Sequence, residues 1–218
     1  VSVSVTAAAP GAGTPSGAVT VSDGTNSCPI TLIGGSGSCS LPSTAVGTPT
    51  LSASYAGDGS FNGSSDTEAH TVNKANTTTS IGGDTPDPTV FGPSYTVSVT
   101  VAAVAPGAGT PSGTVTVTDG ANTCPITLSA GSGSCSLALT AAGARTLTAT
   151  YAGNASFNGS SGTTGHTVNK ANSTTAITSD TTDPSVFGQN FSVAVTVAAA
   201  APGGGTATGL VTVSDGVN

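Results

Sequence analysis

The sequence has no tryptophan and no methionine, and only 6% of its 218 residues are charged. With three lysine and arginine residues in all, it cannot form the basic patch that binding to nucleic acid or to an anionic membrane surface requires. No apolar run approaches the roughly 18 residues of a membrane-spanning helix. The net charge of −7 reflects mainly the scarcity of basic residues, and we expect neither a nucleic-acid partner nor a membrane span in this segment.

Helical periodicity is also absent. Apolar residues alternate with threonine and serine, as in SYTVSVTVA (94–102), GTVTVTDG (113–120) and RTLTATYAG (145–153). A period of two with threonine on the wet face is typical of half-buried antiparallel strands. About seven short strands per repeat, separated by Gly- and Pro-containing turns, predict an all-β fold of tandem immunoglobulin-like antiparallel β-sandwiches with Greek-key topology.

An internal repeat organises the chain. The stretch YAGDGSFNGSS (55–65) returns as YAGNASFNGSS (151–161), and other positions recur at the same offset of 96 residues. A repeat of this length is near the common size of a domain with its own core. The frame predicts three parts: 1–74, an immunoglobulin-like domain that lacks its first strands; 75–170, a complete domain; and 171–218, the N-terminal part of a third domain.

This frame has two interpretations. The chain is a window of a longer array, or it is a subunit that donates residues 171–218 to complete residues 1–74 of the next molecule. Donation would need only the equivalent of residues 75–96, whereas residues 193–218 repeat positions already present as 1–26. We therefore favour the window.

Each complete cysteine pair belongs to one repeat. Cys28 and Cys39 flank a Gly/Ser turn between two apolar alternating runs, and Cys124 and Cys135 do the same in the next copy. This pattern predicts a hairpin with a cross-strand disulfide, Cys28–Cys39 and Cys124–Cys135, against the alternatives of free buried thiols or a metal site. Closing a loop of about 12 residues contributes roughly 3 kcal/mol in the chain-entropy model. Disulfides would imply an oxidising compartment outside the cell.

Large side chains are scarce, since aromatic residues are 4% of the chain. We expect the Tyr and Phe residues that recur at the 96-residue offset to close the ends of each sandwich core. Tyr55 and Tyr151 end inward-facing strands, and a Phe follows each of them after a short turn. The predicted core plugs are Tyr55, Phe61, Phe91, Tyr151, Phe157 and Phe187.

Candidate catalytic residues are few. His70 and His166 are the only histidines, and each lies in the sequence HTVNK. Glu68 precedes His70 by two residues, but its repeat equivalent is Thr164, so the repeats do not share an acid–base pair. We expect both histidines to be structural residues at the edge of the core. The sequence predicts no enzyme activity and no cofactor.

A metal site has only weak candidates. Asp84 with Asp87, and Asp180 with Asp183, lie just after each domain junction, where an interdomain calcium site would need several oxygen ligands. The alternative is an Asx-type turn before the following proline. We expect no metal and treat these four residues as calcium candidates only.

The strand motifs resemble a known family. The stretches DPSVFGQNFSVAVTVAA (183–199) and ATGLVTVSDG (207–216), followed in the full copy by a YAGN turn and a closing HTVNKA, are similar to the bacterial Ig-like repeat domains of group 3. The resemblance implies tandem domains in large secreted and cell-surface proteins, including adhesins. An internal cysteine pair is not general in that family, so it indicates a locally stapled variant.

Together these features predict an extracellular or cell-surface structural module: a stalk, an adhesin segment or a surface-filament unit. Its partners would be neighbouring repeats of the same chain, other copies in a filament, or a ligand on a host surface. The alternatives are a carbohydrate- or ligand-binding module and an accessory region of a larger secreted enzyme. A dedicated binding site would need one repeat with divergent aromatic loops. The aromatic residues instead fall at repeat-equivalent positions.

The junction between repeats is expected to be stiff. HTVNKANTTTSI (70–81) holds no glycine and no proline. Flexible linkers are usually long or rich in glycine and serine, and β-branched residues favour extended backbone. We therefore expect an extended rod.

Overall fold

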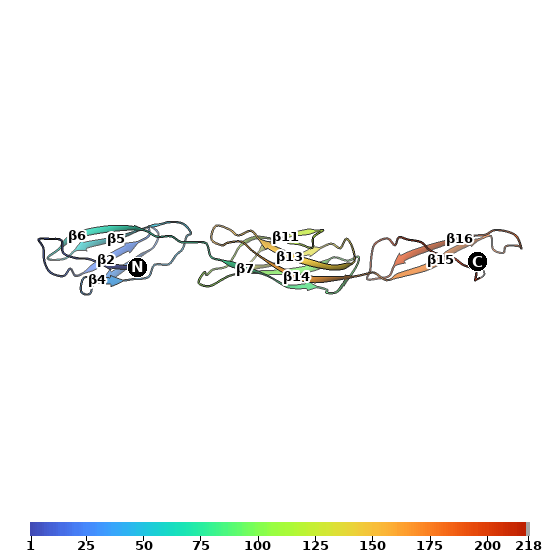
Figure 1. The fold of residues 1–218 in the computed structure, drawn as a ribbon, viewed down its shortest axis with the longest axis horizontal. Helices are drawn as coiled ribbons and strands as arrows, with labels where there is room; N and C mark the ends of the chain where they lie inside the picture. Colours follow the sequence, from blue (N-terminus) through green and yellow to red (C-terminus); the bar gives the residue numbers. More distant parts are fainter. Residues whose placement is uncertain (217–218) are drawn as a thin grey trace. The chain divides into compact units, whose positions relative to one another are not determined.

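A computed structural model describes residues 1–216 of the chain, and these residues form strands and turns without a helix. The chain divides into two compact units, Val1–Lys74 and Ala75–Asn218. Both are built from short, mostly antiparallel strands (Figure 1). The all-β, immunoglobulin-like class expected from the alternating pattern is confirmed.

The first unit has two sheets. A four-stranded antiparallel sheet has the order β3-β2-β5-β6, and β1 pairs with β4 to make a two-stranded sheet. The strands are β1 (Ser2–Ser4), β2 (Ala18–Ser22), β3 (Ser27–Thr31), β4 (Ser36–Ser38), β5 (Thr50–Gly57) and β6 (Asn62–Ala69).

The second unit holds a sandwich and a separate hairpin. Its five-stranded sheet has the order β11-β10-β13-β14-β8, its three-stranded sheet has the order β12-β9-β7, and β15 pairs with β16. Every described pairing between two of its strands is antiparallel except that of β8 with β14, which is parallel. The strands are β7 (Thr77–Thr85), β8 (Thr89–Val90), β9 (Tyr95–Ala103), β10 (Gly113–Thr118), β11 (Thr123–Leu128), β12 (Ser132–Leu137), β13 (Gly143–Tyr151), β14 (Ser160–Asn169), β15 (Ser173–Thr181) and β16 (Ser192–Ala199).

The core of the sandwich lies between its two sheets. Along β9, residues at alternate positions are fully buried and the intervening Thr and Ser residues are exposed, as the period of two predicts. Valine fills most of these positions because a β-branched side chain packs well on a pleated surface. The residues at most 1% exposed in this core are Tyr95, Val97, Val99, Val115, Val117, Leu137, Leu147, Ala149 and Tyr151.

The disulfide pairing Cys28–Cys39 and Cys124–Cys135 is confirmed, with Cα atoms 6.3 and 6.1 Å apart. The expected hairpin is correct only at its turn, where Ser129 and Ser132 exchange backbone hydrogen bonds; the two strands beyond the turn do not pair. In the second unit Cys124 lies on β11 of the five-stranded sheet, and Cys135 lies on β12 of the three-stranded sheet. The Gly/Ser turn carries the chain from one sheet to the other, since β12 pairs with β9 and not with β11. Each disulfide therefore joins the two layers through the core.

The aromatic residues divide into two groups. Tyr55, Tyr151 and Phe157 are buried, and Phe61 is half-buried against the core of the first unit. The hydroxyl groups of Tyr55 and Tyr151 donate to repeat-equivalent carbonyl groups, of Ser16 and Ser112, at 2.8 Å each. The tyrosines thus close the core and also hold the residue that precedes β2 or β10.

The prediction that Phe91 and Phe187 are core plugs is wrong. Phe187 is fully exposed, at 109% of its reference area. Phe91 is half-buried but lies outside the buried cluster, and its carbonyl group accepts a hydrogen bond from the Gly204 amide. Its ring lies against Gly205, where an added Cβ would be 2.7 Å from a ring carbon. The loop after β8 thus places this ring against the segment that follows β16.

We expect Phe157→Ala to lower the free energy of unfolding of the second unit by about 3–5 kcal/mol, because it removes a buried ring. The control is Phe187→Ala, which changes an exposed ring and should shift stability by no more than about 0.5 kcal/mol. Urea denaturation followed by circular dichroism measures both. Equal losses for the two variants would contradict this assignment of the core.

Candidate functional site

A β-bulge turns an aspartate into the sandwich. The ladder between β7 and β9 shifts register between Ile81 and Gly83, so that Asp84 lies opposite Val97, a core residue. Alternate positions of β7 face inward before the shift. Because side chains alternate between the faces of a strand, the extra residue of the bulge places Asp84 on the inner face instead of the outer one. Its side chain is only 13% exposed.

Prolines then end the strand and move the chain to the other sheet. Pro86 and Pro88 flank Asp87, and neither can donate a backbone hydrogen bond to continue the ladder of β7. Thr89 then begins β8, which pairs in parallel with β14 of the five-stranded sheet. The crossing between the sheets therefore carries Asp87 past β14.

His166 comes from β14, on its inward-facing set of residues. Its side chain is fully buried, and its ring stacks on Tyr95 with centroids 4.0 Å apart and planes 6° from parallel. Burial, together with the negative charges of Asp119 and Asp84, raises the pKa of Tyr95 to about 12. The two stacked rings fill the end of the core where β7 crosses to β8.

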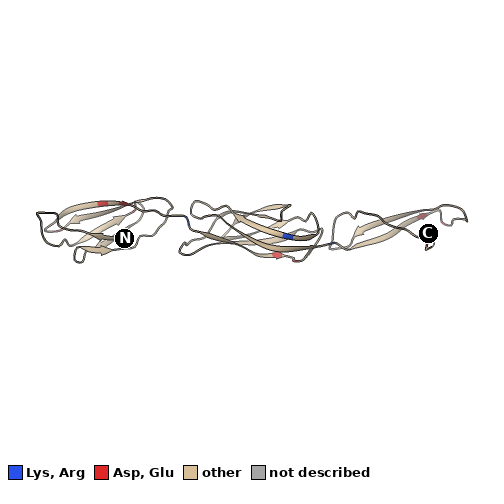
Figure 2. Cartoon of the chain, in the orientation of Figure 1, with Lys and Arg blue, Asp and Glu red and all other residues tan. Residues whose placement is uncertain are grey.

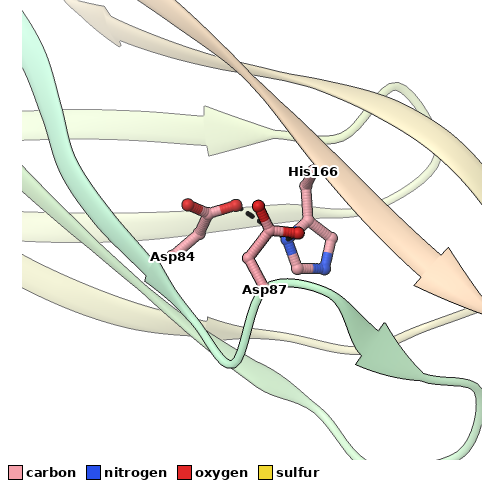
Figure 3. Close-up of side chains that lie close together, drawn as sticks. All are labelled: Asp84, Asp87 and His166. Atoms are coloured by element: carbon pink, nitrogen blue, oxygen red, sulfur yellow. Dashed lines mark hydrogen bonds and ion pairs between the residues drawn. The ribbon is translucent and has the colours of Figure 1, made fainter.

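The three polar side chains converge on one nitrogen (Figure 3). Nδ1 of His166 lies 2.7 Å from Oδ2 of Asp84 and 3.4 Å from Oδ1 of Asp87. The Thr167 amide donates to the same oxygen of Asp87 at 3.0 Å. All three ligand-type atoms lie within 4.8 Å of one another. The short distance to Asp84 fits an Nδ1–H donor and a carboxylate acceptor.

Few other charges lie on the sandwich (Figure 2). Arg145 is opposite His166 in the ladder between β13 and β14, but its guanidinium group donates to the carbonyl group of Ala141 at 3.0 Å. Nε2 of His166 is buried without a hydrogen-bond partner among the described residues. Because Nδ1 is the ring nitrogen that faces Asp84, Nε2 is the one left without a hydrogen-bond partner in the core.

The arrangement has two chemical possibilities besides a structural one. A catalytic His–Asp pair needs a nucleophile and substrate access at the second ring nitrogen, but Nε2 is sealed in the core. A metal ion could be held by Asp84, Asp87 and Nδ1 of His166. It would have to displace the Nδ1 proton and leave an Nε2–H without the acceptor that metal-bound histidines normally have. The geometry therefore fits a structural hydrogen-bonded cluster best.

The calcium candidates are placed differently from the expectation. Asp84 is nearly buried in the second unit's sandwich, and Asp87 lies at its surface; both are beside His166 of the same unit. Asp180 and Asp183 are exposed, and within residues 1–216 the set at His166 is the only group of three that could hold a metal. The interdomain placement is wrong because the bulge and the two prolines turn the aspartates toward β14.

The sequence held a signal that could have identified this cluster. The aspartate pair and the histidine each recur at the 96-residue offset, as Asp84 and Asp180 and as His70 and His166. However, His70 is close to Asp84 in sequence and belongs to the other unit, where it is exposed. The true partner of Asp84 is 82 residues downstream. Only the contact between β7 and β14, the first and last long strands of one sandwich, shows this.

Comparison with known protein families gives one match. The family described as the bacterial Ig-like domain (group 3) matches residues 1–73 and again residues 83–169. A comparison with curated proteins found no significant match. Over residues 1–216, the structure contains no helix long and apolar enough to cross a membrane.

We expect His166→Gln to lower the free energy of unfolding by about 2–3 kcal/mol, because a buried hydrogen bond to a carboxylate and the ring stack are both lost. The matched control is the repeat-equivalent His70→Gln, at an exposed position, with an expected change within about 0.5 kcal/mol. Urea denaturation followed by circular dichroism compares them. A loss at His70 as large as that at His166 would show that the cluster is not the cause.

We also expect no stoichiometric metal in the chain after dialysis. The physical reason is the Nδ1–H bond to Asp84, which a cation must break. Elemental analysis checks this, and a thermal scan with millimolar Ca²⁺ or Zn²⁺ should give the same unfolding temperature as a scan with chelator. A metal-dependent rise that Asp84→Asn abolishes and Asp180→Asn preserves would overturn the structural assignment.

Proposed function

Because the chain belongs to the bacterial Ig-like domain (group 3) family, we propose that it works outside the cell as a stiff, disulfide-stapled stalk or surface-filament module. Its role would be to hold other parts of a surface protein away from the cell and to resist unfolding there. In this proposal residues 75–170 are one complete domain, and residues 1–74 and 171–218 are parts of its neighbours.

The observation that carries this proposal is the shortness of the junctions. In the first unit Val72 still exchanges backbone hydrogen bonds with Gly47, at 2.8 and 3.0 Å. In the second unit Ala75 already donates to Ser156 and accepts from Asn158. Only Asn73 and Lys74 lie between these bonded residues. Two residues give a junction far less freedom than a long Gly/Ser linker.

A second junction inside the second unit repeats this arrangement. The carbonyl group of Asn169 accepts from the Phe91 amide at the end of the sandwich, and that of Asn172 accepts from Ala200 beside the following hairpin. The spacing between the two bonded residues is again short. Equivalent junctions at a period of 96 residues favour a regular array over a single specialised binding domain.

The disulfides support a location outside the cell. Both pairs are formed, and the four cysteines of the chain are all used. Disulfides persist in oxidising compartments and are rare in the cytosol. The partners we propose are the neighbouring repeats of the same chain, with other copies in a filament or a surface ligand as further partners. Adhesion to a host surface is part of this proposal, and it too requires that the chain lie outside the cell.

Small-angle scattering tests the stiffness. Chains with two, four and six copies of residues 75–170 should increase in maximum dimension almost linearly, because strands of about seven residues span roughly 23 Å and end loops add to each domain. We expect an advance of about 35–45 Å per copy.

The matched control carries ten Gly/Ser residues inserted after each Lys170. Its maximum dimension should depend more weakly on copy number, because a flexible linker samples many orientations. If the unmodified array behaves like this control, the junction is a hinge and the stalk proposal is wrong.

A further inference from the structure

The first and last segments of the sandwich run side by side in the same direction. At one end Ala75 forms a parallel bridge with Phe157. At the other end Thr89 pairs in parallel with Val168, and the Phe91 amide donates to Asn169 at 2.9 Å. Residues 75–91 therefore follow residues 157–169 in register order along the whole length of β14. We call this line of contacts the seam.

Side chains fill the seam between its two ends. The Ser160 hydroxyl lies 2.7 Å from the hydroxyl groups of both Thr77 and Thr79. Thr77 also donates to the carbonyl group of Asn158 at 2.8 Å. Gly162 lies so close to Thr79 that a Cβ would overlap its carbonyl group. The close approach explains glycine at this position, and it brings β7 and β14 together although they belong to different sheets.

The His166 cluster continues the seam toward its far end. Asp84 and Asp87 belong to the first segment, and His166 and Thr167 belong to the last. The cluster bonds the two segments where the chain leaves one sheet for the other and no ladder is available. Buried hydrogen bonds of this kind are the stronger ones because an ionised carboxylate accepts them.

We propose that the seam is a mechanical clamp, loaded in shear when the two ends of the domain are pulled apart. The biological use of such a clamp rests on the proposed stalk function, whereas its resistance to force follows from the geometry of the seam alone. Tension enters at Ala75 and leaves after Asn169. Because the two segments are parallel, these points lie at opposite ends of the seam. The segments are then pulled in opposite directions along their length, and all the bonds between them carry load together.

The copies within the chain show what the seam contributes to burial. Thr77 and Thr79 of β7 are buried, whereas the equivalent residues of β15, Ser173 and Thr175, are exposed. The two strands have similar sequences and equivalent antiparallel partners, β9 and β16. What β7 has in addition is the opposite sheet, which it contacts mainly through β14 and also through β13. The burial of this strand therefore comes from that sheet, with β14 its main neighbour, and not from its own hairpin.

Force spectroscopy on the full chain, tethered by its two ends, tests the clamp. When the sandwich unfolds, residues 75–169 are pulled straight, except for the segment that the disulfide closes, whose cysteines are 11 residues apart. The chain should lengthen by about 250–290 Å at roughly 3.4 Å per residue, and this length identifies the unfolding of the sandwich. Ser160→Ala should speed unfolding of the sandwich under constant force by at least about tenfold, because two hydroxyl contacts across the seam are lost. The equivalent Ser64→Ala in the first unit, at an exposed position, should leave that event unchanged.

A second control separates mechanical from thermodynamic loss. Ile126→Val weakens the core away from the seam. The unfolding rates of the two variants under force are compared after each rate is scaled to the loss of unfolding free energy that urea denaturation gives for that variant. Under load, Ser160→Ala should then unfold faster than Ile126→Val. Equal rates would mean that force does not act on the seam, and the proposal would be wrong.

The direction of pulling gives a test without any seam variant. Handles at Pro93 and Lys170 lie at the same end of the seam, so they should open its bonds one at a time. We expect a clearly lower unfolding force than for end-to-end pulling, and equal forces would overturn the clamp. A hinge in the scattering experiment with an intact difference in force would refute the stiff stalk and leave the clamp standing.

Discussion

The contact between the first and last segments of the sandwich is the constraint on which the second unit depends. A two-layer fold leaves an open edge on each sheet, with unpaired backbone groups and exposed apolar positions. Here β7 and β14 close that side, and the crossing from Asp84 to Thr89 lets one segment bond to both sheets. The bulge, the two prolines and the buried histidine all serve this crossing. The disulfide is a further connection between the two layers, from Cys124 on β11 to Cys135 on β12.

The chain achieves this with very little charge. Threonine and serine hydroxyl groups supply many of the contacts between segments, and they need no compensating ion when they are buried. The exception is the pair of carboxylates at His166, where burial has to be balanced by hydrogen bonds. Asp87 remains 39% exposed and keeps contact with water, whereas Asp84 is nearly covered and takes the short bond to Nδ1. The deeper carboxylate thus has the better partner.

The repeats allow residues of the same type to be compared in different surroundings. Asp58 and its equivalent Asn154 both accept the backbone amides of the turn that follows. The amide of Ser60 and the contacts of Ser16 hold the pKa of Asp58 well below its ordinary value. Asn154 makes the same turn without a charge, and its amide group donates to Ser112. Turn geometry, and not a charged site, is therefore what both residues provide.

The sequence by itself determined the all-β class, the 96-residue period, the cysteine pairing and the inward faces of the strands, because each of these follows from local spacing. Alternation assigned Val97 and Val115 to the core without any knowledge of the partner strands. The tertiary structure decided which sheet each strand joins, and this is why the cysteine hairpin became a link between layers. It also decided that Phe91 lies outside the buried cluster and that Asp84 meets His166. Those outcomes depend on a bulge and on strand neighbours far apart in sequence, and no local pattern contains that information.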